Sequence, residues 1–122
     1  MQAEPGGCRF SRACRLLTAR DYGRVFAAAQ RSSNHVFTVL ARPNELGIAR
    51  LGLAIARKHL RRAHARNRVK RIVRESFRHN RALLRGLDVV VLARSGTADA
   101  ERSAMHESLD RHWRRLAEHT PR

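Results

Sequence analysis

From Ala65 to Arg78 the chain reads Ala-Arg-Asn-Arg-Val-Lys-Arg-Ile-Val-Arg-Glu-Ser-Phe-Arg, a mixture of apolar and basic residues at helical spacing. At about 100° per residue, one side of this helix collects Ala65, Val69, Ile72, Val73, Ser76 and Phe77. Another side collects Asn67, Lys70, Arg71, Arg74, Arg78 and Arg81. We therefore expect a helix from about Ala63 to Arg85, closed by Gly86, with its apolar side on a sheet and its basic side turned away from the core.

Two apolar runs flank this helix and are typical of strands that it would cover. The run from Leu87 to Ala93 is apolar almost throughout, which indicates a strand buried on both sides. Residues 51–56 alternate large with small side chains, so that one face holds Leu and Ile and the other holds Gly and Ala. The small face leaves room either for a ligand or for a closely crossing helix, and the sequence leaves both open.

Further elements are expected on either side of this unit. Thr18 and Asp21 match a capping box that begins a short helix, and residues 31–34 are expected to end it. The apolar stripe of that helix consists of Tyr22, Val25, Phe26 and Ala29. A strand at 35–42, a turn at 43–47 and a last helix at about 99–118 complete an α/β or α+β sandwich. We expect one domain over residues 15–118, with tails at 1–14 and 119–122.

The chain is strongly and unevenly basic. Its 122 residues carry 26 Lys and Arg against 10 Asp and Glu, a formal net charge of +16, and only two of the basic residues are lysine. Residues 57–85 hold twelve basic residues and one acid, Glu75. Arginine forms forked contacts with phosphate. Like charges this close on one helix oppose its formation, which indicates that they serve to bind a polyanion. A nucleic acid is therefore the expected partner. Because zinc-finger, RNP-type and helix-turn-helix patterns are missing, recognition of RNA shape and phosphate is favoured over base readout of DNA.

Other classes of protein find little support in the sequence. The longest apolar stretches fall far short of the roughly 20 residues of a membrane span, and the N-terminus does not resemble a secretory signal, so a cytoplasmic protein is expected. Cys8 and Cys14 lack metal-ligand spacing and are expected to be thiols, and the seven His are expected at the surface. The acids are dispersed, which argues against a protein nuclease; Asp88 is the one candidate.

The run from Arg57 to Arg78 resembles the signature of the bacterial ribonuclease P protein component, in which Arg-Asn-Arg opens a basic helix. The resemblance extends to Leu51-Gly52-Leu53, Arg15-Leu16-Leu17-Thr18, Val25-Phe26, Asp88-Val89-Val90-Val91 and Trp113-Arg114-Arg115. It implies an α+β fold similar to a ribosomal-protein domain, a two-layer sandwich with a mixed sheet of about four strands and three helices. It also implies a left-handed β-α-β crossover through the basic helix, where general rules favour a right-handed one.

The resemblance further implies the protein subunit of a ribonucleoprotein that removes the 5′ leader from precursor tRNA. The RNA and Mg²⁺ would carry the chemistry, with no catalytic residue or metal site in the protein; the partners would be ribonuclease P RNA and precursor tRNA, with no membrane and no obligate protein partner. The residues implied to bind the catalytic RNA are Arg57, Arg61, Arg62, Arg66, Asn67, Arg68, Lys70, Arg71 and Arg74. Those implied to bind the single-stranded leader, in a cleft between the first helix and the sheet, are Tyr22, Phe26, Thr38, Leu40, Ala54, Ala56 and Lys58.

Three points stay open on the sequence alone. Tyr22 and Phe26 would offer stacking surfaces to bases, but a stripe of this kind more often belongs to a plain core. Leu40 stands where family members often carry an aromatic or polar residue. The turn at 57–62 is more basic than is usual in the family, and what this additional charge contributes stays open. A ribosomal or other structural RNA-binding protein would share the charge, size and fold class, and is the alternative to a role in tRNA processing.

Overall fold

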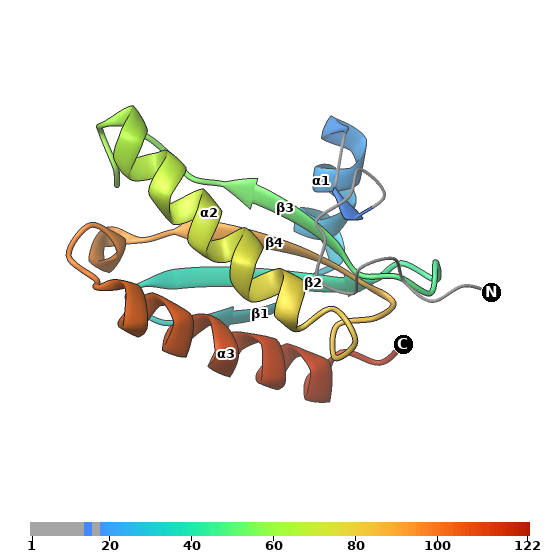
Figure 1. Ribbon diagram of the computed structural model, residues 1–122. Coiled ribbons are helices and arrows are strands. Elements are labelled where there is room, and N and C mark those ends of the chain that lie inside the picture. The colour runs from blue at the N-terminus through green and yellow to red at the C-terminus, as the bar shows by residue number, and fades with distance from the viewer. Residues whose placement is uncertain (1–13, 16–17) are drawn as a thin grey trace.

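A four-stranded sheet with helices on both faces forms the body of the protein in the computed structural model, which describes residues 14, 15 and 18–122 (Figure 1). The elements follow the order α1 (Ala19–Ala28), β1 (Gln30–Ser33), β2 (Phe37–Pro43), β3 (Arg50–Ala54), α2 (Ala63–His79), β4 (Leu87–Ala93), the short 3₁₀ helix η2 (Ser95–Thr97) and α3 (Arg102–His119). The strand order is β1-β2-β4-β3, with β3 and β4 parallel and the other pairs antiparallel. The expected α+β fold with a mixed sheet is confirmed.

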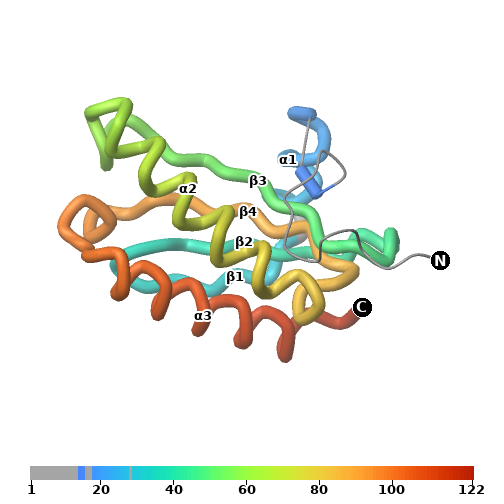
Figure 2. The backbone as a smooth tube through the Cα atoms, viewed as in Figure 1, coloured from blue at the N-terminus to red at the C-terminus, as the bar shows by residue number. Residues whose placement is uncertain are grey.

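The strands β3 and β4 and the helix α2 form a crossover between neighbouring parallel strands. When Figure 1 is turned so that both strands point up, α2 lies in front of the sheet and β4 lies to the left of β3; Figure 2 shows the same path as a tube. The crossover is therefore left-handed, as the family resemblance implies and against the general right-handed rule.

The two faces of the sheet are covered very unequally. α2 and α3 cover one face, over a core whose largest buried side chains include Trp113 and Phe77. These two rings meet edge to face with their centroids 6.3 Å apart, and Trp113 Nε1 donates a 2.8 Å hydrogen bond to Ser76 Oγ. On the other face, α1 covers a much smaller cluster built on Val25 and Val90. Apolar contact therefore holds α1 to the body far less firmly than it holds α2 and α3.

Local signals in the sequence place α1 and β4 as predicted. Thr18 Oγ1 accepts a hydrogen bond from the Asp21 N–H at 3.1 Å, and the Thr18 N–H donates to Asp21 Oδ2 at 3.3 Å, which is the predicted capping box. β4 occupies Leu87–Ala93, and its side chains are buried on both faces. The small face of β3 lies under α1, where Ala54 packs against the smaller cluster, so a crossing helix occupies at least part of the space that the sequence left open.

α2 ends at His79, earlier than the predicted end at Arg85. Asn80 stops the helix, because its side chain donates a 2.8 Å hydrogen bond to the Ser76 carbonyl. Gly86 adopts φ +84°, a conformation that other residues rarely reach, and turns the chain directly into β4. The prediction that Gly86 closes the helix is therefore wrong: the glycine serves the turn before the strand.

Residues 31–34, predicted to end the first helix, belong instead to strand β1 and the turn after it. β1 reads Gln-Arg-Ser-Ser, so no apolar alternation marks it, and its place in the sheet comes from pairing with β2. Its buried Ser32 lies with Oγ 2.6 Å from Nδ1 of His112. His112 is 3% exposed, so the expectation that the histidines lie at the surface is wrong for this one.

The remaining boundaries differ from the predictions by a few residues. β2 begins at Phe37, two residues later than predicted, after a turn in which Asn34 Oδ1 accepts hydrogen bonds from the N–H groups of Val36 and Phe37, at 3.0 Å each. β3 ends at Ala54, and α3 begins at Arg102. Most of the expected tail at 1–14, including Cys8, lies outside the described residues. Cys14 is buried and forms no disulfide with another described residue.

Candidate RNA-binding surfaces

The outward side of α2 presents a row of basic side chains, which we call the basic row. Arg68, Arg71 and Arg74 are exposed, and Lys70 and Arg78 are half-buried. A hollow of about 510 Å³ in this row is bordered by Asn67, Arg71, Arg74, Glu75 and Arg78. Several cationic side chains around a shallow hollow attract a polyanion, and contact with them releases the polyanion's counterions.

Glu75, the one acid of α2, pairs with side chains of α3. It forms an ion pair with Arg102 through Oε1, and the same oxygen lies 3.3 Å from Nε2 of His106. The carboxylate therefore links the two helices. Its charge is already matched by groups outside the basic row, which stays strongly positive.

The N-terminal end of α2 is unusually rich in cations. Arg62 occupies the N-cap position without a capping hydrogen bond from its side chain, and the first turn contains no acid. Arg57, Lys58 and Arg61 in the preceding turn are exposed. The N-terminus of a helix carries a partial positive charge, so these cations gather where they repel it. A bound phosphate would relieve this repulsion.

Arg66 differs from the other residues predicted to bind the catalytic RNA. Its Nη1 donates to the carbonyls of Leu60 and Arg61, at 2.9 and 2.8 Å, and the side chain is half-buried. The guanidinium therefore holds the turn before α2 in shape. Within the predicted Arg-Asn-Arg segment, Asn67 and Arg68 are exposed, whereas Arg66 is engaged with the backbone.

A second hollow, of about 490 Å³, opens between α1 and the sheet, and we call it the α1 hollow. It is lined by Phe26, Ala29, Arg31, Thr38, Leu40, His59, Leu92, Ala93 and Arg94. Three residues predicted for a leader cleft, Phe26, Thr38 and Leu40, are thus brought together. Phe26 is 50% exposed, so much of its ring is available for stacking against a base.

The other four predicted cleft residues do not line the α1 hollow. Tyr22 and Ala54 pack in the cluster beneath α1, and the Tyr22 hydroxyl accepts a 3.1 Å hydrogen bond from a backbone N–H of β3. Ala56 and Lys58 are exposed in the segment after β3, next to His59, which does line the hollow. Tyr22 therefore contributes to the packing of α1, while Lys58 lies near the edge of the hollow.

The sequence prediction missed two cations at the α1 hollow, Arg31 and Arg94. Arg94 Nη1 donates to Ser33 Oγ at 2.7 Å and to the Asn34 carbonyl at 3.2 Å, which fixes the guanidinium at the hollow. A fixed guanidinium there could bind a backbone phosphate. Arg31 lies on β1, a strand that has no apolar pattern in the sequence. Arg94 directly follows β4, and a basic residue at the end of a predicted strand was the one signal that could have indicated it.

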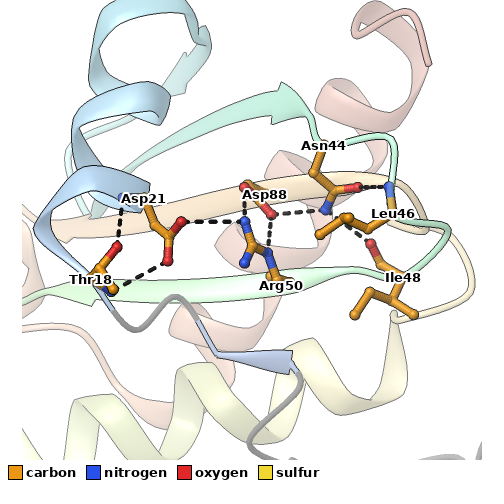
Figure 3. Close-up of polar contacts among 7 residues, drawn as sticks. All are labelled: Thr18, Asp21, Asn44, Leu46, Ile48, Arg50 and Asp88. Atoms are coloured by element: carbon orange, nitrogen blue, oxygen red, sulfur yellow. Dashed lines mark hydrogen bonds and ion pairs between the residues drawn. The ribbon is translucent and has the colours of Figure 1, made fainter.

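A chain of polar contacts ties the first turn of α1 to β3 and β4 (Figure 3). Arg50 donates to Asp88 through Nε at 2.8 Å and through Nη2 at 2.7 Å. The same Nη2 lies 3.7 Å from Asp21 Oδ1, and Asn44 Nδ2 donates to Asp88 Oδ1 at 2.8 Å. The hydrogen bond to Asp88 raises the pKa of the Arg50 guanidinium, against the opposing effect of burial.

Asp88, the acid singled out as a nuclease candidate, is a structural counter-ion. It is 1% exposed, and both carboxylate oxygens accept hydrogen bonds from Arg50. Within residues 14–15 and 18–122, His, Cys, Asp and Glu do not gather in threes as the ligands of a metal ion would. No helix in the described part of the chain is long and apolar enough to cross a membrane.

The chain is similar to known proteins over most of its length. A family model described as Ribonuclease P matches residues 10–117. The ribonuclease P protein component of Photorhabdus laumondii is 50% identical over 106 residues, which cover 87% of this chain and 89% of the relative. The corresponding protein of Yersinia enterocolitica is 46% identical over 112 residues, which cover 92% of this chain and 94% of the relative.

Solved structures of similar chains share the fold. The RNase P protein of Staphylococcus aureus superposes with a TM-score of 0.79 at 28% identity, covering 88% of this chain and 97% of that one. The RNase P protein of Thermotoga maritima superposes with a TM-score of 0.76 at 33% identity, covering 84% of this chain and 96% of that one. The match therefore extends over nearly all of both neighbours.

Proposed function

Because the chain belongs to the ribonuclease P protein family, we propose that it is the protein subunit of a ribonucleoprotein that removes the 5′ leader from precursor tRNA. Its partners are the ribonuclease P RNA and precursor tRNA, it acts in the cytoplasm, and it needs no further obligate protein. The basic row of α2 is the observation that carries this proposal. A rigid helix with cations along one side is suited to the phosphates of a folded RNA, which it recognises by shape.

The catalytic RNA would contact α2 and the basic turn before it. The residues proposed for this contact are Arg57, Arg61, Arg62, Asn67, Arg68, Lys70, Arg71 and Arg74, with Arg66 holding the turn before α2. Charge-assisted hydrogen bonds from arginine to phosphate would fix the orientation of the protein on the RNA. Loss of any exposed cation of this set should weaken assembly and lower its dependence on salt.

The α1 hollow supports binding of the single-stranded leader. A base of the leader would stack on Phe26, over a floor that includes Thr38 and Leu40, with backbone phosphates near Arg31 and Arg94. Stacking needs only the face of a base, so leaders of many sequences would be accepted. This tolerance suits a protein that serves many different precursors.

In this proposal the RNA carries the chemistry, with Mg²⁺ as its metal ion. The described residues of the protein bring no three metal ligands together, so they do not fit a Mg²⁺ site of their own. The contribution of the protein is electrostatic and positional. Its cations reduce the repulsion between catalytic RNA and substrate, and so lower the Mg²⁺ concentration at which the complex works.

The test is cleavage of a 5′-extended precursor tRNA at low Mg²⁺ by the ribonuclease P RNA of the same organism, with and without this protein. Strong stimulation by the protein, together with an inert protein-alone control, is the expected result. If the RNA works alone at high Mg²⁺ but gains nothing from the protein at low Mg²⁺, the proposal fails. The alternative, a structural RNA-binding protein without a role in tRNA processing, would then be favoured.

A further inference from the structure

α1 forms one wall of the α1 hollow, yet few contacts hold it to the rest of the molecule. Its buried cluster rests on Val25 and Val90. Polar contacts supplement this cluster, among them the hydrogen bond that the Tyr22 hydroxyl accepts from β3 and the approach of Asp21 to Arg50 at 3.7 Å. The placement of a ten-residue helix so lightly held depends on each of these contacts.

Arg50, in contrast, is firmly fixed. Its two parallel hydrogen bonds go to Asp88, whose carboxylate is buried and also accepts a hydrogen bond from Asn44. Asn44 is the first residue of the loop between β2 and β3, and its side chain donates to the Ile48 carbonyl of the same loop at 3.0 Å. On the side of its guanidinium away from Asn44, Arg50 faces Asp21, as Figure 3 shows. A rigid cation is thus presented to the first turn of α1.

We propose that Arg50 is a positioning residue for the leader: through Asp21 it holds the first turn of α1 against the sheet, and so fixes Phe26 at the α1 hollow. Asp21 and Phe26 lie about 7.5 Å apart along the axis of the same helix, so a shift of the first turn moves the stacking ring as well. This inference rests on the proposed leader binding. It adds the residue that sets the geometry of the cleft without touching the leader.

The size of the effect follows from the exposure of the pair. The side chains of Arg50 and Asp21 are 18% and 17% exposed, so their attraction is partly shielded from water and partly open to salt. Pairs of this kind give modest coupling. We therefore expect a loss of leader affinity of about two- to fivefold when the pair is broken, and a smaller loss at high salt.

The variant that tests this is Asp21→Asn, which removes the charge facing Arg50 but leaves Arg50 bonded to Asp88. The measurement is the dissociation constant of the assembled ribonucleoprotein for precursor tRNA and for tRNA without a leader. Asp21→Asn should weaken precursor binding two- to fivefold and leave leaderless tRNA unchanged. Asp110→Asn, on the exposed side of α3, makes the same change of charge and should leave the preference for the precursor intact. Asp21→Glu keeps the carboxylate and should retain the preference for the precursor that Asp21→Asn loses.

Two further measurements separate positioning from simple fraying of the helix. Thr18→Ala removes one capping hydrogen bond but keeps the carboxylate opposite Arg50, and it should lose less leader preference than Asp21→Asn. The inference is overturned if Asp21→Asn behaves like Asp110→Asn, or if Thr18→Ala loses as much. A wild-type complex that binds both tRNAs equally would instead overturn leader binding itself, which identifies which of the two proposals has failed.

Discussion

Arg66 and Arg68 stand two residues apart in the motif, yet the structure gives their side chains different surroundings. Arg68 is an exposed member of the basic row, while Arg66 donates two hydrogen bonds to the backbone of the turn before α2. The same residue type therefore supports folding at one position and is open to RNA at the other. The Arg-Asn-Arg motif in the sequence does not show which of its two arginines supports the turn and which is open to RNA.

Alanine at these two positions should separate the roles. Arg68→Ala should lower the slope of log affinity against log salt by up to about one unit, with the free energy of unfolding unchanged, because one phosphate contact is lost. Arg66→Ala should destabilise the free protein by about 1–2 kcal/mol, because two backbone carbonyls lose a charged donor. Salt-dependent binding to ribonuclease P RNA and urea unfolding check both results. Equal loss of stability in the two variants would contradict the assignment.

Burial of His112 makes the stability of the protein depend on pH. Burial, assisted by the charges of Arg115 and Arg111, lowers the pKa of the imidazole to about 4 in the folded state. In the unfolded chain the His112 imidazole takes up a proton near pH 6.5, whereas in the folded protein it does so only near pH 4. The contribution of neutral His112 to the free energy of unfolding is therefore fully present above pH 6.5 and is lost as the pH falls toward 4. The free energy of unfolding should drop by about 2 kcal/mol between pH 7 and pH 5.

Replacing His112 with a side chain that does not titrate should flatten this dependence. His112→Gln should keep a polar partner for Ser32 and remove most of the fall between pH 7 and pH 5. His119→Gln, near the end of the same helix but exposed, should leave the fall in place. Unfolding by urea at several pH values measures both. An unchanged slope in the His112 variant would show that another group titrates.

At the scale of elements, a buried hydrogen bond joins α2 to α3. Ser76→Ala should leave the Trp113 indole N–H without its acceptor in the core and destabilise the protein by about 1–3 kcal/mol. Ser103→Ala, on the exposed start of α3, is the matched control and should change little. Thermal unfolding with tryptophan fluorescence follows both the stability and the surroundings of the indole. Equal stabilities for the two variants would mean that water replaces the serine hydroxyl.

Elements with a strong apolar pattern or a cap were predictable from the sequence, and elements held by polar pairing were not. β4 and the start of α1 follow from an apolar run and a capping box, both of which act locally. β1 was missed because its four polar residues join the sheet through β2, and the end of α2 was missed because Asn80 bonds back to the helix. Such contacts depend on partners in space, which a single sequence does not give.

The candidate sites follow the same rule. The basic row was predictable because charge and helical spacing together define it. Phe26, Thr38 and Leu40 were placed together through the family resemblance, whereas Arg31 and Arg94 became visible only when β1 and the end of β4 met at the α1 hollow. The pairing of Arg50 with Asp88 joins residues 38 positions apart, beyond the reach of any local pattern.

At the scale of the whole molecule, the two surfaces lie on opposite faces of the sheet. α2 covers one face, and α1 lies on the other (Figure 1). The α1 hollow opens on the face that α1 covers. The turn between β3 and α2 connects them, because His59 lines the α1 hollow and the basic residues after it lead into α2. In the proposed function the catalytic RNA binds one face while the leader occupies the other, so the two RNAs need not compete.

The net charge of +16 also predicts how the free protein responds to polyanions. Like charges crowd the basic row and the start of α2, so a bound polyanion should stabilise the folded state by relieving their repulsion. A single-stranded RNA of about a dozen nucleotides at one hundred times its dissociation constant should add about 2.7 kcal/mol. Thermal unfolding with and without the RNA measures this, with potassium chloride at matched ionic strength as the control. At the same RNA concentration, Arg71→Gln combined with Arg74→Gln should reduce the gain. A gain reproduced by chloride alone would show that general screening, rather than binding to α2, stabilises the fold.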